Sequence, residues 1–159
     1  MNKEQSFVAV LGATGYIGAR LVPKLLESGQ KVRAIGRNPD KLKGRTWSSS
    51  AGVETVYGDV FDKTSLETAV AGCKVVYYLV HSMASQDGFQ EADRKAATIF
   101  GQAAREAGLP ETYILLEEPQ AAVYAWIVQR GDRWRKELAP GDRLLVCDVG
   151  GGTTDLTLV

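Results

Sequence analysis

Residues 7–18 read FVAVLGATGYIG, and this stretch decides how the chain folds. It opens with an apolar run that predicts a buried strand and continues into three glycines, Gly12, Gly15 and Gly18. An amphipathic segment at 17–28 follows at once and predicts a helix. A strand, a tight turn and a helix in this order, with glycines at this spacing, form the pattern with which a chain binds a dinucleotide.

Each glycine is expected to serve a different purpose in this turn. Gly12 allows the sharp exit from the strand, Gly15 lets a pyrophosphate approach the backbone, and Gly18 lets the helix lie close to the sheet. Amides at the start of the helix would point at the phosphates, aided by the helix dipole. The candidate contacts from this turn are Gly12, Thr14, Gly15, Tyr16, Ile17 and Gly18.

Glycines also mark ordinary turns, so a purely structural turn is the alternative interpretation. The surrounding sequence favours phosphate binding, because a second strand at 31–35 closes a βαβ unit of about thirty residues. The sequence therefore predicts a dinucleotide-binding unit at the start of the chain.

The motif GATGYIG at 12–18 resembles the extended and atypical short-chain dehydrogenases/reductases, above all their epimerase-like and isoflavone-reductase-like branch. The resemblance runs from about residue 6 to about residue 108. It includes IGRNPDKL after the second strand, YGDVFD after the third and VVYYLVHSM after the fourth. It implies an NAD(P)-binding domain.

The resemblance also implies contacts outside the glycine turn. Asp59 would accept a hydrogen bond from the exocyclic amine of adenine, and Val60 would pack against the adenine ring. Leu79, Val80 and His81 would run beneath the nicotinamide half of the cofactor.

The end of the second strand indicates which dinucleotide is preferred. An NAD-preferring site places Asp or Glu about twenty residues past the glycines, but Arg37 stands at the end of this strand. A guanidinium fork suits a 2′-phosphate, and Lys41 and Arg45 could add positive charge. A solvated basic turn is the alternative. We expect NADP to be preferred, with NAD as the second possibility.

The sequence predicts no catalytic residue and no metal site. The family usually uses a Tyr-x-x-x-Lys pair, in which the lysine lowers the pKa of the tyrosine. None of the six tyrosines is followed by lysine four residues later, and the substrate-binding half of the family is not recognisable. His81, the single histidine, is expected to be a loop residue near the cofactor and not a general base. We therefore expect cofactor binding without turnover.

The last third of the chain carries a different resemblance. LLEEPQAAVYAW at 115–126 and DRLLVCDVGGGTTDLTLV at 142–159 resemble the nucleotide-binding domain of heat-shock chaperones, in the actin-like ATPase superfamily. That resemblance implies a phosphate loop at 150–154, with Asp148 near a metal and its waters. The first phosphate hairpin, the adenosine-binding segment and the second lobe of such an ATPase are missing, so we favour a structural edge hairpin and keep ATP binding as the alternative.

The two resemblances meet in AAREAGLP at 103–110 and indicate a chimera. Each family is cut through the middle of its functional domain at this point. A recombinant or designed origin therefore fits the sequence better than a natural gene. A structural chimera that binds no ligand is a further alternative.

Composition gives no sign of nucleic acid or membrane partners. The 159 residues suffice for one domain, and 19 basic side chains balance 19 acidic ones, which gives no argument for nucleic acid or membrane partners. No apolar run is long enough to span a bilayer, and the start MNKEQS predicts no signal peptide. Cys73 and Cys147 lie in or beside apolar runs and are expected to be buried free thiols, which indicates the cytoplasm. The oligomeric state cannot be predicted.

The order of the elements predicts the fold. We expect an α/β, doubly wound, Rossmann-like three-layer sandwich that forms a single domain over 1–159, with 1–108 as the dinucleotide-binding part and 109–159 completing the sheet. The strand order would be 3-2-1-4-5-6. A seventh strand would lie antiparallel to the sixth, because the glycine turn between them is too short for a crossover. The predicted strands are 7–11, 31–35, 53–57, 74–80, 112–116, 143–148 and 154–159.

Overall fold

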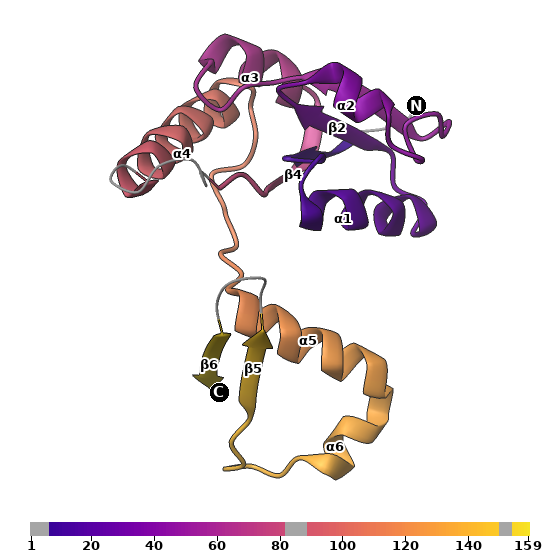
Figure 1. The fold of residues 1–159 in the computed structure, drawn as a ribbon, viewed down its shortest axis with the longest axis vertical. Coiled ribbons are helices and arrows are strands. Elements are labelled where there is room, and N and C mark those ends of the chain that lie inside the picture. Colours follow the sequence, from indigo (N-terminus) through magenta and orange to yellow (C-terminus); the bar gives the residue numbers. More distant parts are fainter. Residues whose placement is uncertain (1–6, 82–88, 150–153) are drawn as a thin grey trace. The chain divides into compact units, whose positions relative to one another are not determined.

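The computed structural model describes residues 7–81, 89–149 and 154–159. Contacts along the chain divide it into two compact units, Met1–Glu111 and Thr112–Val159 (Figure 1). None of the described helices is long and apolar enough to cross a membrane.

A four-stranded parallel sheet forms the centre of the first unit, in the order β3-β2-β1-β4. Leu11 at the end of β1 is in register with Ile35 of β2 and with Tyr78 of β4. Because the strands are parallel and end in register, their carboxyl ends lie at one edge of the sheet. The strands are β1 (Phe7–Leu11), β2 (Val32–Gly36), β3 (Val53–Tyr57) and β4 (Cys73–Tyr78).

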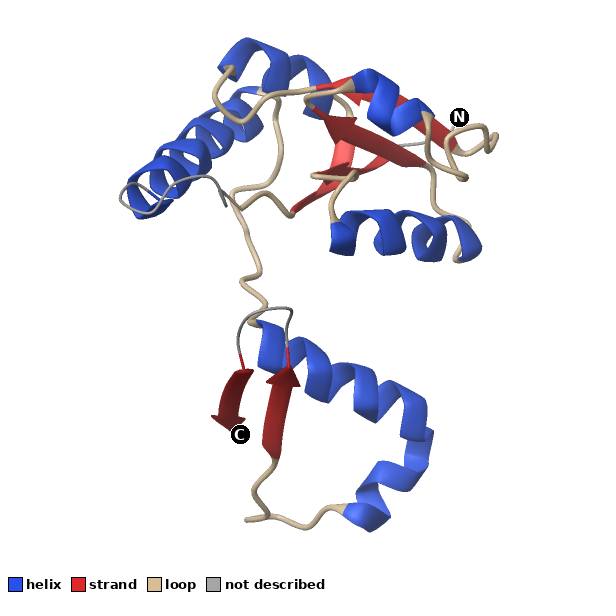
Figure 2. Cartoon of the chain, viewed as in Figure 1, coloured by secondary structure: helices blue, strands red, loops and turns tan. Residues whose placement is uncertain are grey.

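Helices lie on both sides of this sheet (Figure 2). Asn38 caps α2 by accepting hydrogen bonds from the amides of Asp40 and Lys41, and Asp62 caps α3 by accepting one from Ser65. These are the capping residues that the sequence favours, since Asn and Asp side chains pair the free amides of a first turn. The helices are α1 (Tyr16–Glu27), α2 (Pro39–Lys43), α3 (Lys63–Val70) and α4 (Phe89–Glu106).

Alternate residues of β1 point to two different hydrophobic clusters. Ala9 and Leu11 belong to the cluster formed with α3 and α4, whereas Val10 belongs to the cluster formed with α1 and α2. This alternation is what a strand buried on both faces requires. The α/β Rossmann-like fold, with a mainly parallel sheet and a small antiparallel sheet, is confirmed.

The second unit contains a two-stranded antiparallel sheet, in which Cys147 is in register with Leu156. The predicted antiparallel pairing of the last two strands is therefore confirmed. No described residue of this unit is buried. Its elements are α5 (Glu118–Arg130), the 3₁₀ helix η1 (Gly131–Arg133), α6 (Trp134–Glu137), β5 (Leu145–Val149) and β6 (Thr154–Leu158).

The predicted strand order is right for 3-2-1-4 and wrong beyond it. Residues 112–116 form no strand, and β5 and β6 pair with each other in a sheet of their own. Tyr113 and Ile114 have 88% and 92% of their surface exposed, so apolar and β-branched residues here find neither a neighbouring strand nor a covering helix. Strand preference is expressed only when such packing is available. That 1–159 form one domain stays a prediction.

The two cysteines are free, but the prediction that both are buried is wrong. Cys147 is exposed, because no described residue covers its face of β5, and Cys73 is half-buried. Burial raises the pKa of the Cys73 thiol, while the nearby Arg33 guanidinium, 3.5 Å from its Sγ, acts in the opposite direction.

Gly18 should tolerate no side chain. A Cβ atom there would lie 2.4 Å from the carbonyl oxygen of Gly12 and 2.7 Å from Cα of Ala13. We expect Gly18→Ala to lower the free energy of unfolding by about 1–3 kcal/mol, the usual cost of overpacking. Urea titration followed by circular dichroism measures this change.

Gly101, inside α4, is the matched control. No described atom lies within 4 Å of a Cβ atom built at this position. Gly101→Ala should therefore raise the free energy of unfolding by about 0.5–1 kcal/mol, since alanine favours the helix. Equal effects of the two substitutions would contradict the close approach of α1 to the turn.

Candidate functional site

The segments that leave the four parallel strands lie side by side at the carboxyl edge of the sheet. The amide of Gly12 donates to the Ile35 carbonyl at 3.1 Å, and the amide of Leu79 donates to the Leu11 carbonyl at 3.0 Å. The amide of Gly58 donates to the Gly36 carbonyl at 3.2 Å. The edge thus brings together the predicted site residues from four separate parts of the sequence. It is also the edge at which open α/β sheets bind ligands.

The three glycines of the turn differ in backbone conformation, in burial and in the room for a side chain. Gly12 has a φ of +93°, and a Cβ atom there would lie 3.0 Å from the Leu79 carbonyl oxygen. Gly18 is buried and has no room for one. Gly15 has an ordinary φ of −72° and is exposed, and the Gly12 carbonyl oxygen at 3.3 Å is the only described atom near its Cβ position. The φ of Gly12 and the lack of room at Gly18 require glycine for folding, whereas Gly15 is exposed and has one tight neighbour, a backbone oxygen, at its Cβ position.

The amino end of α1 offers hydrogen-bond donors. Gly15 caps the helix, its amide donates to the Gly12 carbonyl, and its carbonyl accepts from Ala19. No described backbone group accepts from the amides of Tyr16, Ile17 or Gly18. The first turn of α1 carries no acidic residue. Unpaired amides and the positive end of the helix dipole together suit an anion.

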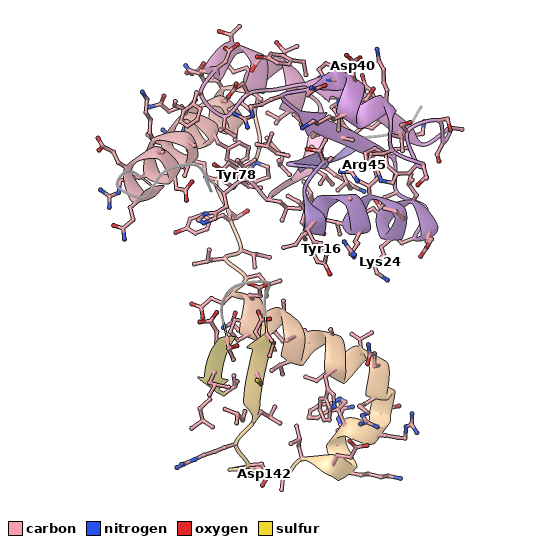
Figure 3. All side chains as sticks on the ribbon, in the orientation of Figure 1. Tyr16, Lys24, Asp40, Arg45, Tyr78 and Asp142 are labelled. Atoms are coloured by element: carbon pink, nitrogen blue, oxygen red, sulfur yellow. The ribbon has the colours of Figure 1, made fainter. Side chains whose placement is uncertain are left out.

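Tyr16 lies at the start of α1 with 75% of its surface exposed (Figure 3). The guanidinium carbon of Arg20 lies 3.6 Å from the centre of the Tyr16 ring, and Arg20 also donates to the Tyr16 carbonyl at 3.2 Å. Arg20 is a neighbour of the site that the motif does not reveal. Its spacing of four residues from Tyr16 is the signal that could have found it.

Arg45 is the basic residue with the closest contact to the glycine turn. Its half-buried guanidinium donates a hydrogen bond to the carbonyl oxygen of Thr14. The sequence predicts Arg45 only as additional positive charge. Its contact with Thr14 joins segments 31 residues apart, which sequence spacing does not indicate.

Arg37 follows β2 and is exposed. No described residue forms a hydrogen bond or ion pair with its guanidinium. The adjoining Asn38 is occupied with capping α2. Arg37 is therefore a cation at the carboxyl end of a strand that is available to a ligand.

Asp59 and Val60 follow β3, and the structure gives them different environments. The Asp59 carboxylate accepts a hydrogen bond from the amide of Phe61 at 3.0 Å, and its own amide donates to the Ser65 hydroxyl at 3.0 Å. Val60 is 95% buried among the residues that pack against α3 and α4 (5% exposed). Its side chain therefore belongs to the core, which leaves its main chain for contact with a ligand.

The segment after β4 combines two core residues with an exposed histidine. Leu79 packs against the cluster on the α1 side, and Val80 packs against the cluster on the α3 side. His81 is exposed, and its Nδ1 atom lies 2.7 Å from the carboxylate of Asp93 on α4. Sequence spacing gives no signal for this contact, because the two residues are twelve positions apart, one after a strand and one on the following helix.

Tyr78, the last residue of β4, is the tyrosine next to this segment. Burial, together with the Asp93 carboxylate, raises the pKa of the Tyr78 hydroxyl. Its ring packs on Phe100, with 4.9 Å between the ring centres. A catalytic tyrosine of the Tyr-x-x-x-Lys type needs the opposite shift.

The second predicted nucleotide site is described only at its borders. Residues 150–153 lie outside the described residues. Asp148 on β5 is directly opposite Asp155 on β6 in the register of the hairpin. In the described part of the chain, no group of three or more His, Cys, Asp or Glu side chains could hold a metal ion.

The comparisons with known proteins agree with this geometry. The profile of a family described as NAD(P)H-binding matches residues 12–129, which continues past the predicted junction at 103–110. The isoflavone reductase homolog IRL of Zea mays is 31% identical over 130 residues, which cover 77% of this chain and 42% of the maize protein. Sterol demethylase protein B of Methylococcus capsulatus is 37% identical over 79 residues, which cover 50% of this chain and 23% of that protein.

Solved structures show the same likeness. The triphenylmethane reductase of Citrobacter sp., solved in complex with NADP(H), has a TM-score of 0.53 and 29% identity over 65% of this chain and 34% of its own. A nucleoside-diphosphate-sugar epimerase of Staphylococcus aureus has a TM-score of 0.54 at 20% identity, over 65% of this chain and 35% of its own, and shares the fold. The chain spans less than half the length of each of these relatives. Because the family profile matches most of the chain, from the glycine turn through α5, this chain belongs to the NAD(P)H-binding family.

Proposed function

We propose that this chain binds NADP in preference to NAD and that it does so without catalytic turnover. One observation carries the proposal: the amides of Tyr16 and Ile17 have no described backbone acceptor, and they follow the exposed Gly15 at the same sheet edge as the exposed Arg37. Family membership supports dinucleotide binding. The choice between the two dinucleotides depends on Arg37.

The pyrophosphate would bind at the amino end of α1, to the amides of Tyr16 and Ile17. The adenine would lie at the end of β3, where Asp59 accepts from its amine and the main chain of Val60 borders the ring. The nicotinamide half would extend along 79–81. The hydrogen bonds that hold these segments side by side support this path.

The preference for NADP follows from charge at the end of β2. A 2′-phosphate there would meet the guanidinium of Arg37, and no Asp or Glu occupies the position that commonly binds the ribose hydroxyls of NAD. The Citrobacter reductase, which was solved with NADP(H), supports the same choice.

Turnover is not expected from the residues present. No tyrosine of the sequence has a lysine four residues later, and the pKa of Tyr78 is raised. The matched residues cover only 23% and 42% of the lengths of the two curated relatives. A substrate-binding part would therefore have to come from residues other than these.

The chimeric origin of residues 109–159 remains a hypothesis. It is supported by the resemblance of 142–159 to a chaperone phosphate loop and by the separate compact unit that begins at Thr112. ATP binding by this hairpin is not favoured, because in the described residues nothing gathers around Asp148 to hold a metal. Location in the cytoplasm and the absence of nucleic acid and membrane partners also remain predictions.

Arg37→Ala should change the ratio of the two affinities. Charge-assisted hydrogen bonds from Arg37 to a 2′-phosphate would add to the binding free energy of NADPH. Their loss should weaken NADPH binding roughly ten- to a hundredfold. NADH lacks this phosphate, and its affinity should hardly change. Fluorescence titration of the folded protein with both cofactors measures the ratio.

Lys24→Ala is the control for this substitution. It removes one positive charge from the opposite end of α1 and should leave both affinities unchanged. An equal loss of NADPH and NADH binding in Arg37→Ala would mean that Arg37 supports the fold and does not recognise the phosphate.

Gly15→Leu should prevent binding of both cofactors while the protein stays folded. The new side chain would lie next to the amides of Tyr16 and Ile17. Its Cβ atom would lie 3.3 Å from the Gly12 carbonyl oxygen, a tight contact that a shift of a few tenths of an ångström in the turn relieves. We expect each affinity to fall by at least about a hundredfold. Gly101→Leu, at an exposed position of α4, controls for side-chain size. Unchanged binding by Gly15→Leu would place the pyrophosphate elsewhere.

The absence of turnover can be tested directly. NADPH absorbance should stay constant when simple aldehydes or ketones are added to the purified protein. Magnesium and ATP should release no phosphate above background. Cofactor oxidation that depends on the protein, or phosphate release that Asp148→Ala abolishes, would show that the chain catalyses a reaction.

A further inference from the structure

Arg45 contacts the glycine turn from a segment whose backbone is well anchored. Its amide donates to the Leu42 carbonyl at 3.1 Å, and its carbonyl accepts from the amide of Ser48 at 3.0 Å. Leu42 and Trp47, on either side of it, are buried in the cluster on the α1 side of the sheet. The side chain therefore projects from a segment whose backbone is held by hydrogen bonds and packing.

The guanidinium of Arg45 fixes one particular peptide group. The Thr14 carbonyl accepts from Arg45, and the Gly15 amide, at the other end of the same peptide group, donates to the Gly12 carbonyl at 3.0 Å. Both ends of the Thr14–Gly15 peptide are thus hydrogen-bonded. The plane of this peptide determines the direction in which α1 begins, and hence where its first amides point.

The same contact bears on which amides stay unpaired. In an α-helix the amide of Gly18 would donate to the Thr14 carbonyl if the helix began one residue earlier. That carbonyl instead accepts from Arg45, and the amides of Tyr16, Ile17 and Gly18 have no described backbone acceptor. Arg45 thus occupies the Thr14 carbonyl, and the amides at the start of α1 can donate to an anion.

We propose that Arg45 is a positioning residue for the pyrophosphate site, which it sets through the Thr14 carbonyl, and that it supports NADP and NAD equally. This inference rests on the proposed function of the same site. It separates two basic residues by role: Arg37 would distinguish between the two cofactors, whereas Arg45 would prepare the part of the site that both share.

Arg45→Met tests this role, because methionine keeps an apolar stem and loses both the donors and the charge. We expect the affinities for NADPH and NADH to fall by about the same factor, about tenfold, since a hydrogen bond from a charged donor to a partly buried carbonyl is lost. The Gly15 amide should exchange its hydrogen faster in the cofactor-free protein. Fluorescence titration and amide hydrogen exchange followed by NMR measure the two effects.

Lys43→Met is the matched control, since it removes a positive charge from the last residue of α2, two residues before Arg45, where no described side-chain hydrogen bond joins Lys43 to the glycine turn. It should leave both affinities and the hydrogen exchange of the Gly15 amide unchanged.

Arg45→Lys keeps the charge and a donor, so the protein should remain folded. Its affinities for both cofactors should fall equally, by less than those of Arg45→Met. Titrations at low and high salt separate charge from position, because only an effect of charge is screened.

The outcomes separate this inference from the proposed function. Failure of the parent protein to bind either cofactor would overturn the proposed function, and unchanged exchange of Gly15 in Arg45→Met would overturn the positioning role by itself. A loss confined to NADPH would make Arg45 a phosphate ligand and overturn equal support. A loss that disappears at high salt would likewise overturn positioning, because it would reflect charge alone.

Discussion

The first unit depends on one close approach, that of helix α1 to the turn that leaves β1. A side chain at Gly18 would collide with the backbone of Gly12 and Ala13, so only glycine lets the two segments lie this near. From this position Val22 reaches the buried cluster next to Val10. The same approach brings the amino end of α1 to the carboxyl edge of the sheet. The packing of the core and the geometry of the candidate site are thus consequences of one contact.

Local features of this unit could be predicted from the sequence because their causes are local. Asn38 and Asp62 cap the helices that follow them, and a capping side chain needs only the amides two or three residues further on. The order 3-2-1 could be predicted for a similar reason, since the connections from β1 to β2 and from β2 to β3 are short and bring neighbouring strands together. β3 and β4 lie at opposite edges of the sheet, so the place of β4 beside β1 could be predicted only from the strand order typical of dinucleotide-binding folds. The burial of β1 on both faces follows from its unbroken apolar run.

Features that depend on distant partners could not be predicted. Residues 112–116 have the composition of a strand, but the described chain provides no neighbour for it. The hydrogen bond from Arg45 to Thr14 and the contact between His81 and Asp93 join segments that meet only after folding. The sequence contains the residues for these contacts, but no spacing rule relates them. At Val60 the motif indicates a residue next to the candidate site, but it does not indicate that the side chain is buried in the core.

The segment at 112–116 has a consequence for how the chain responds to proteases. No backbone hydrogen bond to a described residue holds it, and the side chains of Tyr113, Ile114 and Leu115 are largely exposed. A protease needs an extended, accessible backbone, and aromatic and leucine side chains are what chymotrypsin selects. Cleavage by such an enzyme after Tyr113 or Leu115 would fall at the start of the second compact unit. It would release the parallel sheet with its glycine turn as a fragment that retains both hydrophobic clusters.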